Sequence, residues 1–331
     1  MAAIRNKKRV FYSSTLSEVG RALLGKREDI EAVSFPASLS GPDFVKLIGT
    51  GGETHGAILG GTRFGEAECE AANGLQVIAR IGVGFDAIDV PALTKRKVPL
   101  MTVGIANSPS VAEQAMHMML SLAKRGAELN TLVAANNWAN RMSAVPFDLI
   151  GKTVLIIGFG RIGTRTAKRC DAMEMKVAVY DPYVPAAAIM AAGYEAASNL
   201  DAALPHADFV SIHCPKTQET IGMFNAARLA KLKPTAYLVN TARGGIVDEA
   251  ALHAALTSGK LAAAGLDVYD KEPPEPDNPL LKLPNVLSAP HMAGVTKESL
   301  DRMAIQAVEN CFSVFDGRPI ADNVINKEVL G

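Results

Sequence analysis

The chain has 331 residues, enough for two domains of ordinary size, with 48% hydrophobic and 21% charged residues. Its formal net charge is zero, so we expect no nucleic acid and no membrane surface as a partner. No apolar run approaches the roughly 20 residues of a membrane span, and none follows the basic N-terminus as in a signal peptide. The four cysteines lie far apart and form no C-x-x-C pair, so we expect a reducing cytoplasm and no metal site.

Residues 9–103 alternate short apolar runs with stretches of helical composition. The runs that we expect to form strands are Val10–Tyr12, Ala32–Phe35, Ala57–Leu59, Val77–Ala79 and Pro99–Val103. Segments such as Gly65–Asn73 and Asp86–Lys97 lie between them, and this alternation is typical of βαβ units and a parallel sheet. No G-x-G-x-x-G stands here between a strand and a helix. We therefore predict a doubly wound domain without a dinucleotide of its own.

A long helix is expected from Ser108 to about Asn130, with Ser108 as its N-cap and Pro109 at the first helical position. Its apolar side includes Val111, Ala115, Met118, Met119 and Leu122. This side suits either a helix packed in the core or a dimer contact, and the sequence does not decide between the two. Residues 131–150 are polar and loop-like.

The second half opens on a pattern that predicts a nucleotide site. The apolar run Val154–Ile157 is followed by a G-x-G-x-x-G at Gly158, Gly160 and Gly163 and then by helix-forming composition. Such a short run, apolar on both faces, indicates a buried parallel strand. Gly158 permits the tight turn, Gly160 lets the backbone approach a pyrophosphate, and Gly163 lets helix and strand pack closely. The pyrophosphate is expected at the helix N-terminus, where free N–H groups and the helix dipole favour negative charge.

The next strand, Val177–Tyr180, ends in Asp181. An acid at about this spacing binds the adenosine ribose hydroxyls, so we predict NAD as the cofactor. Further strands are expected at 209–212, 236–239, 263–266 and 286–289, and a helix over 296–316. The fold class that follows is α/β, with two doubly wound, Rossmann-like parallel-sheet domains. We expect an inserted cofactor domain, residues 104–295, within a substrate domain made of residues 1–103 and 296–331.

Polar residues stand at the carboxyl ends of the last three expected strands, where ligands of such sheets bind. They are Arg243, Asp267 and His291. Hydride transfer between a nicotinamide and a carbonyl or carbinol carbon needs a proton donor, a cation for the carboxylate, and a group that tunes the donor. His291, Arg243 and Glu272 can supply these three functions. A carboxylate bonded to an imidazole fixes its tautomer and stabilises its protonated form.

At these residues the chain resembles the D-isomer-specific 2-hydroxyacid dehydrogenases, most of all their phosphoglycerate-dehydrogenase branch. The matching segments, spread over nearly the whole chain, are Arg80–Asp89, Ala106–Glu113, the glycine motif with Asp181-Pro182, His213–Pro215, Asn240–Asp248, Gly265–Val268, Glu272-Pro273 and Pro290-His291. The resemblance implies an NAD-dependent oxidoreductase acting on a CH–OH group. It implies Arg243 as the binder of carboxylate and carbonyl, His291 as acid/base and Glu272 as its partner.

The resemblance also implies the residues that contact the ligands, with Asp267 at the nicotinamide carboxamide and backbone N–H groups at the substrate carboxylate. The expected cofactor contacts are Gly158, Gly160, Arg161, Ile162, Gly163, Asp181, His213, Cys214, Pro215, Thr241, Ala242, Asp267 and His291. The expected substrate contacts are Arg80, Val83, Gly84, Arg243 and His291.

The chain departs from that branch in two respects. The branch often carries an arginine after the strand at 57–59, where this chain has Gly60-Gly61, and we expect no C-terminal regulatory extension. A short 2-oxo or D-2-hydroxy acid of the hydroxypyruvate or glyoxylate type is therefore favoured as substrate, with 3-phosphoglycerate as the alternative. The family also implies a homodimer, formed through the 109–126 helix and nearby residues.

Two other functions are possible on the same fold. One is formate- or phosphite-type oxidation, and Glu272 argues against the formate branch, which generally has a glutamine there. The other is a co-repressor that uses NAD(H) to control assembly. Such proteins can retain Arg243, Glu272 and His291, so these residues do not exclude that function, whereas the lack of long disordered flanks disfavours it.

Overall fold

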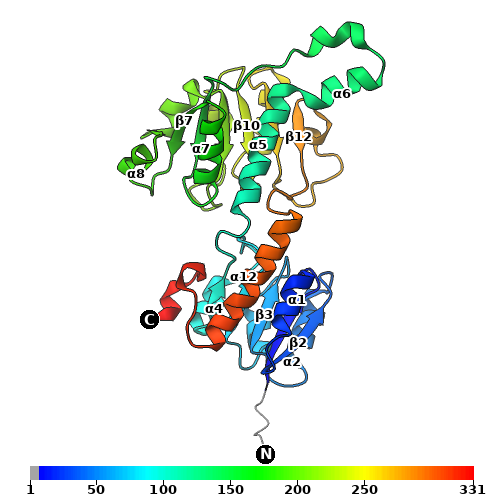
Figure 1. Ribbon diagram of the computed structural model, residues 1–331, viewed down its shortest axis with the longest axis vertical. Helices are drawn as coiled ribbons and strands as arrows, with labels where there is room; N and C mark the ends of the chain where they lie inside the picture. The colour runs from blue at the N-terminus through cyan, green and yellow to red at the C-terminus, as the bar shows by residue number, and fades with distance from the viewer. Residues whose placement is uncertain (1–6) are drawn as a thin grey trace, which may run out of the picture. The chain divides into compact units, whose positions relative to one another are not determined.

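The computed structural model describes residues 7–331, so the expectation of no signal peptide falls partly outside the described residues. The chain divides into a terminal unit, Met1–Asn107 with Val295–Gly331, and a central unit, Ser108–Gly294. In each unit the paired strands of the sheet are parallel and helices lie on both faces (Figure 1). The predicted fold of two parallel-sheet α/β domains is confirmed. Within residues 7–331, no helix is long and apolar enough to cross a membrane.

The terminal unit is built on a five-stranded sheet in the order β2-β1-β3-β4-β5. Its strands are β1 Lys8–Ser13, β2 Ile30–Phe35, β3 Gly56–Leu59, β4 Val77–Arg80 and β5 Leu100–Met101. Its helices are α1 Glu18–Leu24, α2 Gly41–Gly49, α3 Glu66–Ala71, α4 Val90–Lys95, α12 Lys297–Phe315, η4 Ala321–Asn323 and η5 Lys327–Leu330. Every residue of β3 and β4 is buried because α1 and α12 cover one face and α2, α3 and α4 the other.

The central unit is built on a seven-stranded sheet in the order β12-β11-β10-β9-β6-β7-β8. Its strands are β6 Thr153–Ile157, β7 Lys176–Tyr180, β8 Glu195–Ala196, β9 Phe209–Ile212, β10 Tyr237–Asn240, β11 Ala263–Leu266 and β12 Val286–Ser288. Its helices are α5 Ser108–Lys124, α6 Gly126–Ala134, η1 Trp138–Ala144, α7 Gly163–Ala172, α8 Ala186–Ala191, α9 Leu200–Ala203, η2 Leu204–His206, α10 Ala226–Leu229, α11 Glu249–Thr257 and η3 Pro279–Lys282. β10, β11 and β12 are neighbours, so the residues that follow them share one edge of the sheet.

The single helix expected over residues 108–130 is wrong. α5 ends at Lys124, Arg125 adopts a left-handed backbone with φ +50°, and α6 begins at Gly126. A glycine directly after this residue weakens the helix, and an ion pair between Arg125 and Glu128 holds the new direction. Ser108 is the first residue of α5 rather than a residue before it, and η1 lies within the segment expected to be a loop.

The apolar side of α5 is packed inside its own unit. Ala115, Met118 and Met119 are fully buried in one cluster with strand residues such as Ile156 and Val239. The core interpretation therefore accounts for this side of the helix. Within α6, Gly126–Ala134, no residue is buried, and Figure 1 shows α6 standing away from the sheet of its own unit. Large apolar side chains that remain exposed follow α5 in the sequence, namely Val133, Trp138, Met142, Val145 and Ile150.

Candidate active site

The glycine motif forms the turn between β6 and α7. Gly158 has φ +92°, and a Cβ on it would lie 2.8 Å from the backbone nitrogen of Cys214. A Cβ on Gly163 would lie 1.9 Å from the carbonyl oxygen of Gly158, so only glycine allows this packing of helix against strand. At Gly160, by contrast, no described residue comes within 4 Å of where a Cβ would stand. The loop is thus open to a ligand at its middle glycine.

Asp181 lies against this loop, directly after β7. One carboxylate oxygen accepts the N–H of Phe159 at 2.7 Å, and the other accepts the N–H of Tyr183 at 2.9 Å. These bonds fix the orientation of the carboxylate, and each oxygen keeps a lone pair for a hydroxyl donor. Arg161 is exposed within the same turn, and Ile162 precedes α7.

Two buried polar atoms stand at the carboxyl ends of neighbouring strands. They are Nδ1 of His213, after β9, and Oγ1 of Thr241, after β10, and neither has a hydrogen-bond partner within the described residues. Nε2 of His213 lies 2.9 Å from Oγ of Ser211, and burial lowers the pKa of this imidazole to about 3. An unsatisfied buried polar atom costs about 1–3 kcal/mol, which a bound ligand can offset. Together with the opening at Gly160, these atoms fit a dinucleotide.

Cys214 and Pro215 continue the loop that begins at His213. The backbone of Cys214 is the part that packs closest to Gly158, and burial raises the pKa of its thiol to about 11. The carbonyl oxygen of Pro215 accepts the hydroxyl of Thr220 at 2.7 Å. The loop is therefore fixed by its own contacts, with a cysteine that stays protonated at neutral pH.

His291, after β12, is paired with Glu272 from the loop after β11. Nδ1 of His291 lies 2.6 Å from Oε2 of Glu272, and Oε1 of Glu272 accepts the N–H of Tyr269 at 3.1 Å. The side chains are 46% and 36% exposed, so the pair faces solvent rather than the core. An ionised carboxylate can only accept, so Nδ1 donates and Nε2 is the nitrogen able to exchange a proton.

Asp267 holds the segment that carries His291. Its two buried carboxylate oxygens accept the N–H groups of Met292 and Ala293, each at 2.8 Å, and its carbonyl oxygen accepts the N–H of His291 at 2.7 Å. Burial raises the pKa of Asp267, and the two N–H groups oppose this shift. These contacts keep His291 in a left-handed conformation with φ +56°. The structure therefore gives Asp267 a role within the chain besides the expected contact with a carboxamide.

Arg243 stands on the loop after β10, which Asn240 shapes. The side-chain nitrogen of Asn240 donates to the carbonyl oxygen of Arg243 at 2.9 Å, and its oxygen accepts the N–H of Ala242 at 3.0 Å. Nη1 of Arg243 donates to the carbonyl oxygen of Ala242 at 2.7 Å. Asn240 is not among the site residues expected from the sequence, although it begins the matching segment Asn240–Asp248. Its signal is a buried amide at a strand end, directly before a turn that needs both a donor and an acceptor.

The expected substrate residues of the terminal unit are Arg80, the last residue of β4, and Val83 and Gly84 in the loop after it. Arg80 is only 9% exposed, and its Nε donates to the carbonyl oxygen of Gly84 at 3.0 Å. Within residues 7–331 the N–H groups of Val83 and Gly84 donate no hydrogen bond, so they are available to an anion. A Cβ on Gly60 would lie 2.7 Å from Oγ1 of Thr15, so this position has no room for a longer side chain unless Thr15 moves.

Residues 116–293 match the family model described as D-isomer specific 2-hydroxyacid dehydrogenase, NAD binding domain. The chain is 41% identical over 255 residues to a D-3-phosphoglycerate dehydrogenase of Archaeoglobus fulgidus, covering 77% of this chain and 48% of that one. It is 39% identical over 264 residues to a glyoxylate reductase of Thermofilum pendens, covering 79% and 78%. The solved TT0316 protein from Thermus thermophilus superimposes with a TM-score of 0.84 at 32% identity, over 96% and 99% of the two chains.

The chain spans 48–60% of the length of the first phosphoglycerate dehydrogenases that it matches. Across residues 7–331, no group of three or more His, Cys, Asp or Glu side chains is placed to hold a metal ion. The family match covers more than half of the chain and includes the glycine turn, Asp181 and the His291–Glu272 pair. The chain belongs to the D-isomer-specific 2-hydroxyacid dehydrogenase family, and residues 116–293 are the NAD-binding domain of that family.

Proposed function

We propose that the protein is an NAD-dependent D-2-hydroxyacid dehydrogenase, working as a 2-oxoacid reductase in the reverse direction. The observation that carries this proposal is the pair of His291 and Glu272, with Nδ1 and Oε2 2.6 Å apart. It stands on the same sheet edge as Arg243, in the unit that also holds the glycine turn. A proton donor, a tuning carboxylate and a guanidinium are what hydride transfer to a 2-oxo acid requires.

The proposed chemistry assigns one task to each side chain. The chemistry supplied by bound NAD would be acceptance of the hydride in oxidation and, as NADH, its donation in reduction. In reduction, Nε2 of His291 gives its proton to the carbonyl oxygen of the substrate, and His291 then takes a proton from solvent. Glu272 accepts the Nδ1–H of His291 and stabilises the positive ring before the transfer. Arg243 binds the substrate carboxylate and polarises the carbonyl, with forked donors that match both oxygens.

The cofactor contacts that we propose are those expected from the sequence. Gly158, Arg161, Ile162 and the open backbone at Gly160 would bind the pyrophosphate at the start of α7, and Asp181 the ribose. Supporting this, the polar atoms of His213 and Thr241 are buried without a partner within the described residues. We also propose that Asp267 contacts the carboxamide, since each of its oxygens retains acceptor capacity beyond one backbone N–H.

For the substrate we propose a small unphosphorylated acid, such as hydroxypyruvate or glyoxylate, rather than 3-phosphohydroxypyruvate. Two observations support this choice. Gly60 offers no cation, and the guanidinium of Arg80 is buried with its Nε already bonded to Gly84, so a phosphate would meet fewer cationic donors than two arginines supply. The N–H groups of Val83 and Gly84 would bind the substrate carboxylate.

The test is a turnover assay of NADH with a panel of 2-oxo acids. We expect reduction of hydroxypyruvate or glyoxylate with a higher kcat/KM than that of the phosphorylated acid. A kcat/KM about tenfold higher for the phosphorylated acid would overturn the substrate choice, since tenfold equals about 1.4 kcal/mol of transition-state binding. NADH binding without turnover of any acid would overturn the enzyme assignment and favour a co-repressor.

We also propose a homodimer in the cytoplasm. The apolar side of α5 is buried within its own unit and is not available to a second subunit. We therefore propose that the dimer contact is formed by the segment after α5 rather than by the 109–126 helix. Exposed Val133, Trp138 and Met142 support this surface. Four free cysteines, three of them buried, suit a reducing compartment.

A further inference from the structure

Two loops of the central unit carry Arg243 and Glu272, two of the three proposed catalytic side chains. The arginine loop, residues 241–248, joins β10 to α11 and carries Arg243. The glutamate loop, residues 267–278, joins β11 to η3 and carries Glu272. The two loops touch directly, because a Cβ on Gly244 would lie 1.8 Å from the carbonyl oxygen of Tyr269. The geometry of one loop therefore depends on the other.

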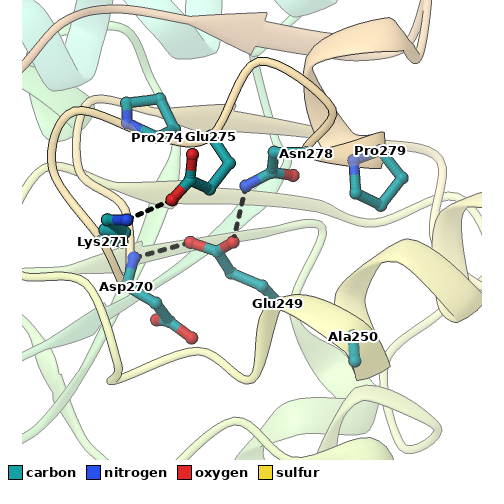
Figure 2. Close-up of a pocket in the computed structure, with 8 residues that line it drawn as sticks. All are labelled: Glu249, Ala250, Asp270, Lys271, Pro274, Glu275, Asn278 and Pro279. Atoms are coloured by element: carbon teal, nitrogen blue, oxygen red, sulfur yellow. Dashed lines mark hydrogen bonds and ion pairs between the residues drawn. The ribbon is translucent and has the colours of Figure 1, made fainter.

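Glu249, the first residue of α11, ties the glutamate loop at two points. Figure 2 shows one carboxylate oxygen accepting the N–H of Asp270 at 2.7 Å and the other accepting the side-chain nitrogen of Asn278 at 2.8 Å. These two points lie on either side of Glu272. Burial raises the pKa of Asp270, and the backbone N–H of Gly245 in the arginine loop opposes this shift. Asp270, which Glu249 binds, is therefore also close to the arginine loop.

These bonds are not needed to form α11. The N-cap of α11 is Asp248, whose side chain accepts the N–H of Ala251 at 2.9 Å. Glu249 is free of that task and directs its carboxylate out of the helix. It lies at a pocket of about 320 Å³ behind the glutamate loop, whose lining includes Asp270, Lys271 and Glu275 but neither His291 nor Arg243 (Figure 2).

We propose that Glu249 is a positioning residue, which holds the glutamate loop so that Glu272 meets Nδ1 of His291. It touches no reacting atom and acts through the backbone of Asp270 and the side chain of Asn278. When this hold is lost, Glu272 spends less time at His291 and the protonated ring loses part of its stabilisation. The kinetic consequence rests on the function proposed above, whereas the effect on the protonation of His291 does not.

The test compares Glu249→Gln, Glu249→Asp and wild type. Gln has a single acceptor oxygen, so its amide nitrogen must face either the N–H of Asp270 or the side-chain nitrogen of Asn278, and one of the two bonds is lost. The Asn278 amide cannot turn over to compensate without losing the bond from the N–H of Leu280, 3.0 Å long. Asp keeps the charge but is one methylene too short. For both variants we expect the upper pH limb of reductive kcat to move down by roughly 0.5–1 pH unit, part of the effect of an adjacent opposite charge. NADH affinity should not change.

A second readout needs no turnover. In protein labelled with ¹³C-histidine, the His291 signal, identified by its loss in His291→Asn, should titrate at lower pH in both variants. If wild type reduces no 2-oxo acid, the proposed function fails, and this titration still decides the role of Glu249. An unchanged His291 midpoint in both folded variants would overturn the proposal. A shift in Glu249→Gln without one in Glu249→Asp would also overturn it, because charge rather than position would then be the cause.

Glu275→Gln is the matched control. It removes a carboxylate from the same pocket, but within residues 7–331 the side chain of Glu275 pairs only with the exposed side chain of Lys271 on the same loop. We expect neither readout to move, and a shift as large as that of Glu249→Gln would contradict the proposal. Asn278→Ala retains the bond to Asp270 and should give a smaller shift in the same direction. If a Glu249 variant does not fold, Asn278→Ala tests the proposal in its place. An unchanged midpoint of the His291 titration in Asn278→Ala would then count against the proposal.

Discussion

At the scale of single residues, Asp181 should decide which dinucleotide is used. The N–H groups of Phe159 and Tyr183 hold its carboxylate beside the glycine turn, where it would repel a 2′-phosphate. We expect kcat/KM with NADH to exceed that with NADPH by at least about tenfold, and Asp181→Ala to narrow this ratio. Glu195→Ala, which removes an exposed acid from β8, should leave the ratio unchanged. A higher kcat/KM with NADPH in wild type would contradict the assignment.

His213 should make the free energy of unfolding depend on pH. Its folded pKa is about 3, against about 6.5 in an unfolded chain. Between these pH values the unfolded chain binds a proton that the folded chain does not. Proton binding by the unfolded chain therefore lowers the free energy of unfolding. The stabilisation of the folded chain is complete above pH 6.5 and is lost as the pH falls toward 3, at up to about 1.4 kcal/mol per pH unit. Urea unfolding of His213→Gln between pH 5 and 7, followed by circular dichroism, should show a shallower decline than wild type.

The control for this experiment is His206→Gln, because His206 is exposed. The free energy of unfolding of His206→Gln should decline with falling pH as steeply as that of wild type. If His213→Gln declines as steeply as wild type, another group is responsible for the pH dependence.

Some site residues could be predicted from the sequence and others could not. The difference lies in whether a local sequence pattern or the tertiary packing sets their contacts. Asp181, Arg243 and His291 stand within three residues of the ends of apolar strands, so strand periodicity alone places them at one edge of a sheet. The role of Glu249 depends on Asp270, 21 positions away in another loop. The local sequence does not predict which loops are in contact in the folded chain. The burial of Arg80 likewise follows from packing, and a motif cannot show it.

At the scale of elements, the strands could be predicted because parallel strands buried on both faces are continuous apolar runs. β8 was not predicted, since its two residues, Glu195–Ala196, leave no such run and are not buried. The break at Arg125 was missed because the helical periodicity continues across it, whereas a single left-handed residue changes the direction of the chain. Burial of the α5 side is a property of the packed unit, and composition could not separate it from a dimer contact.

The junction of β6 and α7 offers a test at this scale. Gly163→Ala would place a methyl group 1.9 Å from the carbonyl oxygen of Gly158, so the glycine turn must shift. We expect stability to fall by about 1–3 kcal/mol, as for overpacking, and NADH affinity to fall at least about tenfold. Gly160→Ala meets no described residue, so its stability should stay near wild type while NADH binding weakens. Calorimetry and fluorescence titration measure the two effects, and an unchanged NADH affinity in Gly163→Ala would contradict this account of the turn.

At the scale of the whole molecule, the exposed apolar side chains after α5 predict the oligomeric state. Replacing Trp138 and Met142, 66% and 70% exposed, by glutamate should convert a dimer into a monomer, because unpaired charges would be buried at the contact. Met190→Glu, at a residue 58% exposed on α8, is the control and should remain dimeric. Light scattering at micromolar concentration measures the mass. A monomeric wild type would contradict the dimer, and a dimeric double variant would place the contact elsewhere.

The central claim is that His291, tuned by Glu272, is the proton donor of a 2-oxoacid reductase. The most direct measurement is kcat of His291→Asn against wild type, at saturating NADH and with the best 2-oxo acid of the panel. Loss of the general acid should lower kcat by about 10²–10⁴-fold, with NADH affinity nearly unchanged. A kcat within about threefold of wild type, far below the usual effect of general acid catalysis, would contradict the mechanism.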